Sequence, residues 1–140
     1  MHYAEICQVP RRDNNHLVMI HGFGGNMYTY YRMLKYLKDY FYITLLDIPG
    51  QGFNYRDPEL KNIKSVEEWI FYFVNTLNRF FEKMNYKRFM LAGHSKGGYI
   101  SSYYTKKYPE KVQMLHLISP AGFSSFEEGE LEEWKKRFDS

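Results

Sequence analysis

Cysteine is nearly absent from this chain, and so are the apolar runs and leader segments that direct a protein into or across a membrane. The single cysteine, Cys7, excludes a disulfide within the chain and is typical of a reducing compartment. No apolar run approaches the roughly 18 residues that a membrane-spanning helix needs. The N-terminus lacks the charged and then apolar pattern of a secretion signal. We therefore expect a soluble, intracellular protein for which peripheral contact with a membrane remains open.

Common ligand-binding patterns are missing as well. No G-x-x-x-x-G-K-[ST] is present and no G-x-G-x-x-G follows a strand, which argues against a nucleotide-binding loop. No group of His, Cys and Asp residues has metal-ligand spacing, so we expect no metal and no other cofactor. The net charge of +3 is small and no basic stripe accompanies it, so we expect no nucleic-acid partner.

What the chain does contain is enough apolar material for one compact core. Of its 140 residues, 44% are hydrophobic and 25% are charged, which is an ordinary balance for a globular domain. Aromatic residues reach 19%, which fits either a biased composition or an aromatic-lined, lipid-facing cleft.

Short apolar runs alternate with helical patterns along the chain. The apolar runs predict strands over residues 17–20, 42–46, 89–92 and 112–118. The helical periodicity predicts helices over about residues 26–38, 65–83 and 98–108. Asn26 caps the first helix, and a capping box at Ser65 and Glu68 opens the second. This alternation predicts an α/β protein with about four parallel strands and helices on both faces, whose ligands bind beyond the carboxyl ends of the strands.

The most informative motif is Gly93-His94-Ser95-Lys96-Gly97, a G-x-S-x-G sequence between a predicted strand and a predicted helix. This context is typical of a nucleophile elbow, in which a tight turn exposes the serine hydroxyl. Glycines flank the serine because neighbouring backbone leaves no room for a β-carbon. We therefore predict that Ser95 is a catalytic nucleophile, a role that requires a base and a pocket for an oxyanion.

The oxyanion pocket is predicted from two backbone positions. The N–H of Lys96, directly after the serine, is the first expected donor. The second is expected from the glycine-rich loop after the first long apolar run, with the Phe23 N–H as the best candidate and Gly24 next. His21, Gly22, Gly24 and His94 are expected to line the site.

The histidines of the chain are not obvious bases. His94 neighbours the serine in a tight turn, where adjacent side chains point apart, so we expect it to pack beside the strand. His21 precedes a glycine at a strand end and is expected to brace the oxyanion loop through backbone hydrogen bonds. His116 lies within a predicted buried strand and is interpreted as a core histidine. Asp47 ends a strand and is expected to fix the turn that follows it.

These residues resemble the α/β-hydrolase superfamily over residues 15–123. A narrower resemblance is to the branch of cardiolipin deacylases, N-acyl-phospholipid lysophospholipases and the coactivator of adipose triglyceride lipase; proline iminopeptidases and epoxide hydrolases match less well. The resemblance to this branch is carried by four segments of the sequence. They are Ser65-Val66-Glu67-Glu68-Trp69, Gly93-His94-Ser95-Lys96-Gly97-Gly98-Tyr99, Lys107-Tyr108-Pro109-Glu110-Lys111-Val112 and Ser119-Pro120-Ala121-Gly122-Phe123.

The resemblance implies a serine ester hydrolase or acyltransferase that acts on glycerophospholipid or lysophospholipid acyl esters through an acyl-serine intermediate. It also implies a lipid partner, and a location in the cytoplasm or on the surface of a mitochondrial or lipid-droplet membrane. Two alternatives stay open. One is a non-catalytic lipid- or lipase-binding pseudoenzyme, and the other is a small-molecule carboxylesterase or peptidase of the same superfamily.

Two departures from the family pattern stand out. Position 96 is usually apolar in the family, and Lys96 could pair with a substrate phosphate or extend to solvent. The family places an acid and then a histidine after the serine, whereas only 45 residues follow Ser95 and His116 is the only histidine among them. We therefore expect a truncated core in residues 1–125, the start of a cap helix in residues 126–140, and little or no activity from this chain alone.

Overall fold

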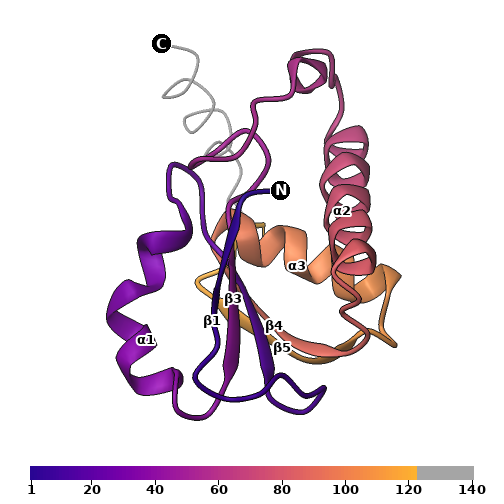
Figure 1. Cartoon of the computed structure of the whole chain (residues 1–140). Helices are drawn as coiled ribbons and strands as arrows, with labels where there is room; N and C mark the ends of the chain where they lie inside the picture. Colours follow the sequence, from indigo (N-terminus) through magenta and orange to yellow (C-terminus); the bar gives the residue numbers. More distant parts are fainter. Residues whose placement is uncertain (123–140) are drawn as a thin grey trace.

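A computed structural model describes residues 1–122 as one α/β layer structure (Figure 1). The predicted cap helix in residues 126–140 lies outside the described residues. The strands are β1 Tyr3–Ile6, β2 His16–Ile20, β3 Tyr42–Leu46, β4 Phe89–His94 and β5 Val112–Ile118. The α-helices are α1 Tyr31–Leu37, α2 Val66–Lys83 and α3 Lys96–Lys107, and the 3-10 helices are η1 Met27–Tyr30 and η2 Pro58–Lys61.

The strands form one sheet in the order β1-β3-β2-β4-β5. β2, β3, β4 and β5 are parallel, as the alternation of strands and helices predicts. β1, which the apolar runs did not predict, pairs antiparallel with β3 at the edge of the sheet. Successive strands lie on opposite sides of β2, which makes the carboxyl end of β2 a topological switch point, the place where such sheets bind ligands.

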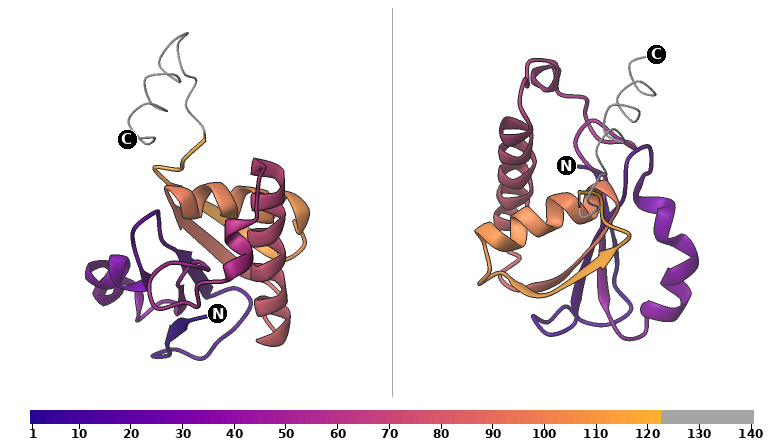
Figure 2. Two further views of the ribbon diagram at one scale, coloured as in Figure 1. Left: turned by 90° about the horizontal axis from the view of Figure 1, so that it is seen from above. Right: turned by 180° about the vertical axis from the view of Figure 1, so that it is seen from behind.

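Helices cover both faces of the sheet, as the sequence predicts (Figures 1 and 2). Alternate residues of β2 point to opposite faces, so Val18 and Ile20 pack under α2 and α3, whereas Leu17 and Met19 pack under α1. The core beneath α2 and α3 is rich in aromatic rings, among them Phe81, which is completely enclosed. Both cores therefore fix β2 and β4, whose carboxyl ends carry the predicted site.

The helix starts are capped as the sequence predicts. The Asn26 side chain accepts a hydrogen bond from the Tyr28 N–H, although the first turn that it caps is the 3-10 helix η1 rather than α1 itself. The Ser65 hydroxyl accepts the Glu68 N–H at 3.1 Å. The Glu68 carboxylate accepts the N–H of Lys64, one residue before the position that a standard capping box uses.

β5 departs from its predicted burial. Met114 is 53% exposed and Leu117 is 39% exposed, because β5 pairs with β4 alone among the described strands. His116 is exposed too, so its interpretation as a core histidine is wrong. The apolar run of residues 112–118 correctly predicted a strand, but the burial of a strand depends on neighbours that its own sequence does not encode.

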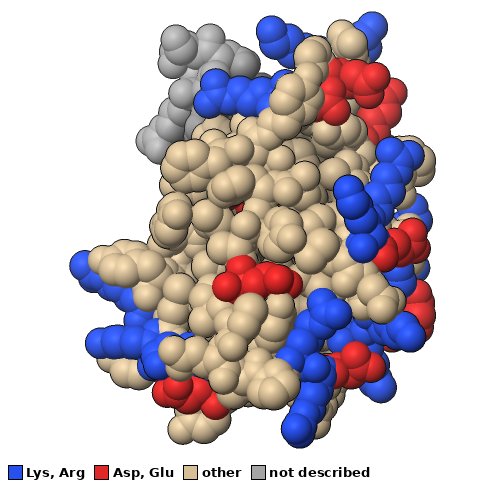
Figure 3. All heavy atoms as spheres, in the orientation of Figure 1, with Lys and Arg blue, Asp and Glu red and all other residues tan. Residues whose placement is uncertain are grey.

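Charge is distributed without a dominant patch on the face in view. Figure 3 shows Lys and Arg side chains mostly along the edges of this face with Asp and Glu among them, and a small acidic group near the middle of an otherwise uncharged surface.

Candidate active site

Ser95 is the single residue between β4 and α3, and its backbone conformation is strained. Its φ is 50° and its ψ is −116°, values that a residue with a β-carbon rarely adopts and that cost about 1–3 kcal/mol. Three backbone hydrogen bonds hold this conformation: the Ser95 N–H donates to Ile118 O, and the Ser95 carbonyl accepts from Tyr99 and Ala121. The tight turn predicted from the G-x-S-x-G motif is therefore present.

Glycines allow the turn to pack against the loop after β2. A β-carbon on Gly93 would lie 2.5 Å from the carbonyl oxygen of Gly97, and one on Gly97 would lie 2.5 Å from that of His21. A β-carbon on Gly22 would lie 3.0 Å from Ser95 Cβ. The fold thus brings the loop at Gly22 directly against the serine, as the parallel strand order predicts.

His21 braces this loop through its ring, which is completely buried. Its Nδ1 lies 2.7 Å from the Gly22 carbonyl oxygen, and its Nε2 lies 3.0 Å from the Ile48 nitrogen. A neutral ring with the proton on Nδ1 donates the first bond and accepts the second. Burial lowers the pKa of His21, against the opposing effects of the Gly22 carbonyl and Asp47. The predicted bracing role is confirmed.

Asp47 ties the same loop to the turn after β3. Its buried carboxylate accepts the Phe53 N–H at 2.9 Å, which confirms the predicted bond to the downstream turn. It also accepts the Met27 N–H at 2.6 Å and contacts His2 Nδ1 at 2.8 Å. These two contacts were not predicted, because they join residues far apart in the sequence.

Two backbone N–H groups near Ser95 have no hydrogen-bond acceptor within residues 1–122. Gly24, the second choice for the oxyanion loop, donates its N–H to Gln51 Oε1 at 3.2 Å. The N–H groups of Phe23 and Lys96 donate to no acceptor in the described part of the chain. The Lys96 N–H also opens α3, where the helix dipole favours negative charge. These two groups are therefore available to donate to an oxyanion, whereas the N–H of Gly24 is already bonded.

The Lys96 side chain folds into an aromatic cage rather than extending to solvent. Its ammonium lies 4.6 Å from the ring centroid of Trp69, 5.0 Å from that of Phe73 and 5.8 Å from that of Phe23. Burial lowers the pKa of Lys96 below its ordinary value. Within residues 1–122 the ammonium has neither a carboxylate within 4.0 Å nor a hydrogen-bond acceptor.

None of the five histidines bonds to the Ser95 hydroxyl in the described structure. His94 was expected to pack beside the strand, but its ring lies against the loop after β2: its Nδ1 lies 2.9 Å from the position of a β-carbon on Gly22 and is buried without a partner among residues 1–122. His2, His16 and His21 bond to other groups, and His116 is exposed on β5. The described residues therefore present a serine without its base.

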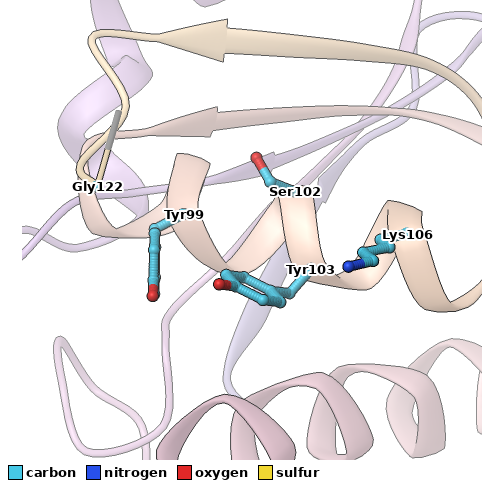
Figure 4. A pocket seen from close by; sticks show the side chains of 5 residues that line it. All are labelled: Tyr99, Ser102, Tyr103, Lys106 and Gly122. Atoms are coloured by element: carbon cyan, nitrogen blue, oxygen red, sulfur yellow. The ribbon is translucent and has the colours of Figure 1, made fainter. Parts of the chain in front are cut away.

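A hollow of about 250 Å³ lies along α3, close to the elbow. Figure 4 shows Tyr99 and Tyr103 projecting from one side of this helix and Ser102 from another. Ser95 is not among the described residues that line this hollow. In residues 1–122 no helix is long and apolar enough to cross a membrane, and no three metal-ligating side chains gather together.

Comparison with known proteins finds similarity to one family and to several of its members. The family model of the alpha/beta hydrolase fold matches residues 15–139. A probable 1-acylglycerol-3-phosphate O-acyltransferase of Oryza sativa is 37% identical over 122 residues, which are 87% of this chain and 29% of that protein. A (lyso)-N-acylphosphatidylethanolamine lipase of Bos taurus is 32% identical over 112 residues, 80% of this chain and 32% of that protein.

Among solved structures, a bacterial membrane phospholipase A that is a virulence factor superposes with a TM-score of 0.76 at 28% identity. The match covers 97% of this chain and 41% of that one. The chain therefore spans about a third of the length of the curated relatives and under half of this solved structure.

Proposed function

Since the chain belongs to the family of the alpha/beta hydrolase fold, we propose that it performs acyl transfer on glycerophospholipid or lysophospholipid esters, with Ser95 as the nucleophile. Relatives of the chain include lipid acyltransferases and lipases. The observation that carries the proposal is the strained backbone of Ser95, at φ 50° and ψ −116°, because an ordinary serine in a turn has no need of this conformation.

In the proposed reaction the Ser95 oxygen attacks the ester carbonyl carbon while a base takes its proton. The carbonyl oxygen becomes an oxyanion between the N–H groups of Phe23 and Lys96. The ester C–O bond then breaks, and the alcohol leaves with the proton from the base. Water, or the hydroxyl of a second lipid, attacks the acyl-serine in the same way and releases the acyl group. The base has to come from outside residues 1–122.

The names of two relatives support the proposed substrate class. The plant relative is named for 1-acylglycerol-3-phosphate, and the mammalian relative for a phosphatidylethanolamine derivative. Both names describe a glycerol backbone that carries an acyl chain and a phosphate. We therefore propose that this protein works inside the cell at a lipid surface, in the cytoplasm or on a mitochondrial or lipid-droplet membrane.

A non-catalytic lipid- or lipase-binding module is the second candidate. The observation that favours it is the absence of any histidine bonded to Ser95 within residues 1–122, since a serine without a base is a weak nucleophile. Loss of a triad base lowers turnover by about a million-fold. The polypeptide of 140 residues, assayed alone, is therefore expected to be nearly inactive under either proposal.

Labelling with a fluorophosphonate separates the two candidates. The protein should be expressed from its complete natural reading frame, labelled, and digested to locate the modified peptide by mass spectrometry. We expect label on Ser95, none in Ser95→Ala, and full label in Ser102→Ala, which removes another hydroxyl of α3. No label on Ser95 in this protein would reject catalysis and support the binding module.

A further inference from the structure

We propose that Lys96 selects the head group of the substrate, favouring an anionic phosphate ester and excluding a choline-bearing one. The inference deepens the proposed function and rests on it, because it places the head group beside the acyl ester at Ser95. The Lys96 ammonium lies 5.8 Å from the ring centroid of Phe23, and the preceding residue, Gly22, packs directly against Ser95, so the ammonium and the serine adjoin the same loop. Three observations carry the inference: the aromatic cage, the unpaired ammonium and the open side of the cage.

The cage is built from two separate parts of the fold. Trp69 and Phe73 come from successive turns of α2, and Phe23 comes from the predicted oxyanion loop after β2. Phe73 is only 2% exposed, whereas Phe23 is 78% exposed. The ammonium of Lys96 is therefore enclosed on the α2 side by Phe73, while the side toward Phe23 and the loop after β2 is open to solvent.

The ammonium of Lys96 lacks the partners that an enclosed charge normally has. It carries three N–H donors, and aromatic faces attract its charge without accepting all of them. Among residues 1–122 no oxygen accepts a hydrogen bond from it. Lys111 shows the usual arrangement, since its ammonium bonds to Asn78 and Glu82. A phosphate bound beside Ser95 would supply the missing acceptor.

The same cage disfavours a positively charged head group. Clusters of aromatic rings are the environment that holds a quaternary ammonium such as choline. Here the ammonium of Lys96 already lies against those rings, 4.6 Å from Trp69 and 5.0 Å from Phe73. A choline group would have to approach a like charge in a partly dry environment. Removing the charge at position 96 should therefore open the cage to choline.

The test measures binding of three soluble hexanoyl lipids to the full-length protein in the Ser95→Ala background, which prevents acyl transfer during the titration. The lipids are lysophosphatidate, lysophosphatidylcholine and monoacylglycerol, all used below their micelle concentration. We expect Lys96→Met to bind lysophosphatidate about tenfold more weakly, because a charge-assisted hydrogen bond is lost. The same variant should bind lysophosphatidylcholine more tightly and monoacylglycerol unchanged, while Lys96→Arg should keep the wild-type order.

Lys107→Met is the matched control, because the ammonium of Lys107 also lies over two rings, 5.2 Å from Phe71 and 5.4 Å from Tyr108. It should leave all three affinities unchanged. Equal lysophosphatidate affinity in Lys96→Met and the parent would overturn the inference. If circular dichroism shows that Lys96→Met does not fold, Lys96→Gln replaces it with the same expectations.

The two proposals fail separately. If the fluorophosphonate does not label Ser95 but Lys96→Met loses its lysophosphatidate preference, catalysis is rejected and head-group selection stands as a property of a binding module. If Ser95 is labelled and Lys96→Met binds all three lipids like the parent, the nucleophile stands and the selector role is rejected.

Discussion

His16 lies at the start of β2, at the end of the sheet opposite Ser95, and only 1% of it is exposed. Its Nε2 lies 2.9 Å from Thr44 Oγ1, and its ring packs edge-on against Tyr86 with the centroids 4.3 Å apart. Burial lowers the pKa of His16 from 6.5 to about 4, and the charge of Arg11 acts in the same direction. His16 is therefore neutral in the folded chain at neutral pH.

We expect His16 to make the free energy of unfolding fall as the pH falls from 6.5 to about 4. The unfolded chain binds a proton at this histidine below pH 6.5, whereas the folded chain binds it only near pH 4. The contribution of His16 is thus complete above pH 6.5 and lost across this window, by about 3 kcal/mol in total. His21 adds to the loss, because burial lowers its pKa too.

Urea unfolding of the wild type and of His16→Gln, at neutral pH and near pH 4.5, measures this contribution. The wild type should lose more stability on acidification than the variant. His116→Gln is the control for the loss of a histidine ring, because His116 is exposed on β5. Equal losses in the wild type and His16→Gln would contradict the prediction.

At the scale of elements, the backbone at the start of α3 lies so close to the backbone at the end of β2 that no side chain fits between them. A β-carbon on Gly97 would overlap the carbonyl oxygens of Ile20 and His21. We expect Gly97→Ala to lower the free energy of unfolding by roughly 1–3 kcal/mol, because backbone on both sides has to move. The same shift should move Ser95 away from Gly22 and reduce its labelling by a fluorophosphonate.

Gly24→Ala is the matched control for stability. Gly24 has a φ of 69°, but a β-carbon there would meet nothing within 4 Å. Its substitution should therefore cost only the backbone strain, about 1 kcal/mol. Urea unfolding of both variants measures the difference, and a smaller loss in Gly97→Ala than in Gly24→Ala would show that the contact between α3 and β2 relaxes easily.

Much of this element arrangement could be predicted from the sequence, because it depends on local patterns. The apolar runs predicted β2 to β5, and the G-x-S-x-G spacing predicted the turn at Ser95. The exposure of His116 could not be predicted, since it depends on which strand covers β5. The position of the Lys96 ammonium could not be predicted either, because a flexible side chain settles where α2 places the rings of Trp69 and Phe73.

For the molecule as a whole, the two faces of the sheet are unequally covered. The face beneath α2 and α3 forms the larger aromatic core. On the other face α1 covers β2 and β3, and a hollow of about 430 Å³ opens between α1 and β5, lined almost entirely by apolar side chains. Leu117 lines this hollow and is 39% exposed. Among residues 1–122 the outer edge of β5 has no partner strand, and an apolar face beside such an edge favours association with another chain.

We expect the polypeptide of 140 residues, prepared alone, to associate through β5 and the adjoining hollow. Leu117→Lys should weaken this association by about tenfold, because a buried leucine contact is replaced by a charge. Tyr36→Lys is the control: Tyr36 is 68% exposed on α1 and should leave association unchanged. Sedimentation velocity over a range of concentrations measures all three. A wild-type polypeptide that stays monomeric throughout would show that this face needs no cover to remain in solution.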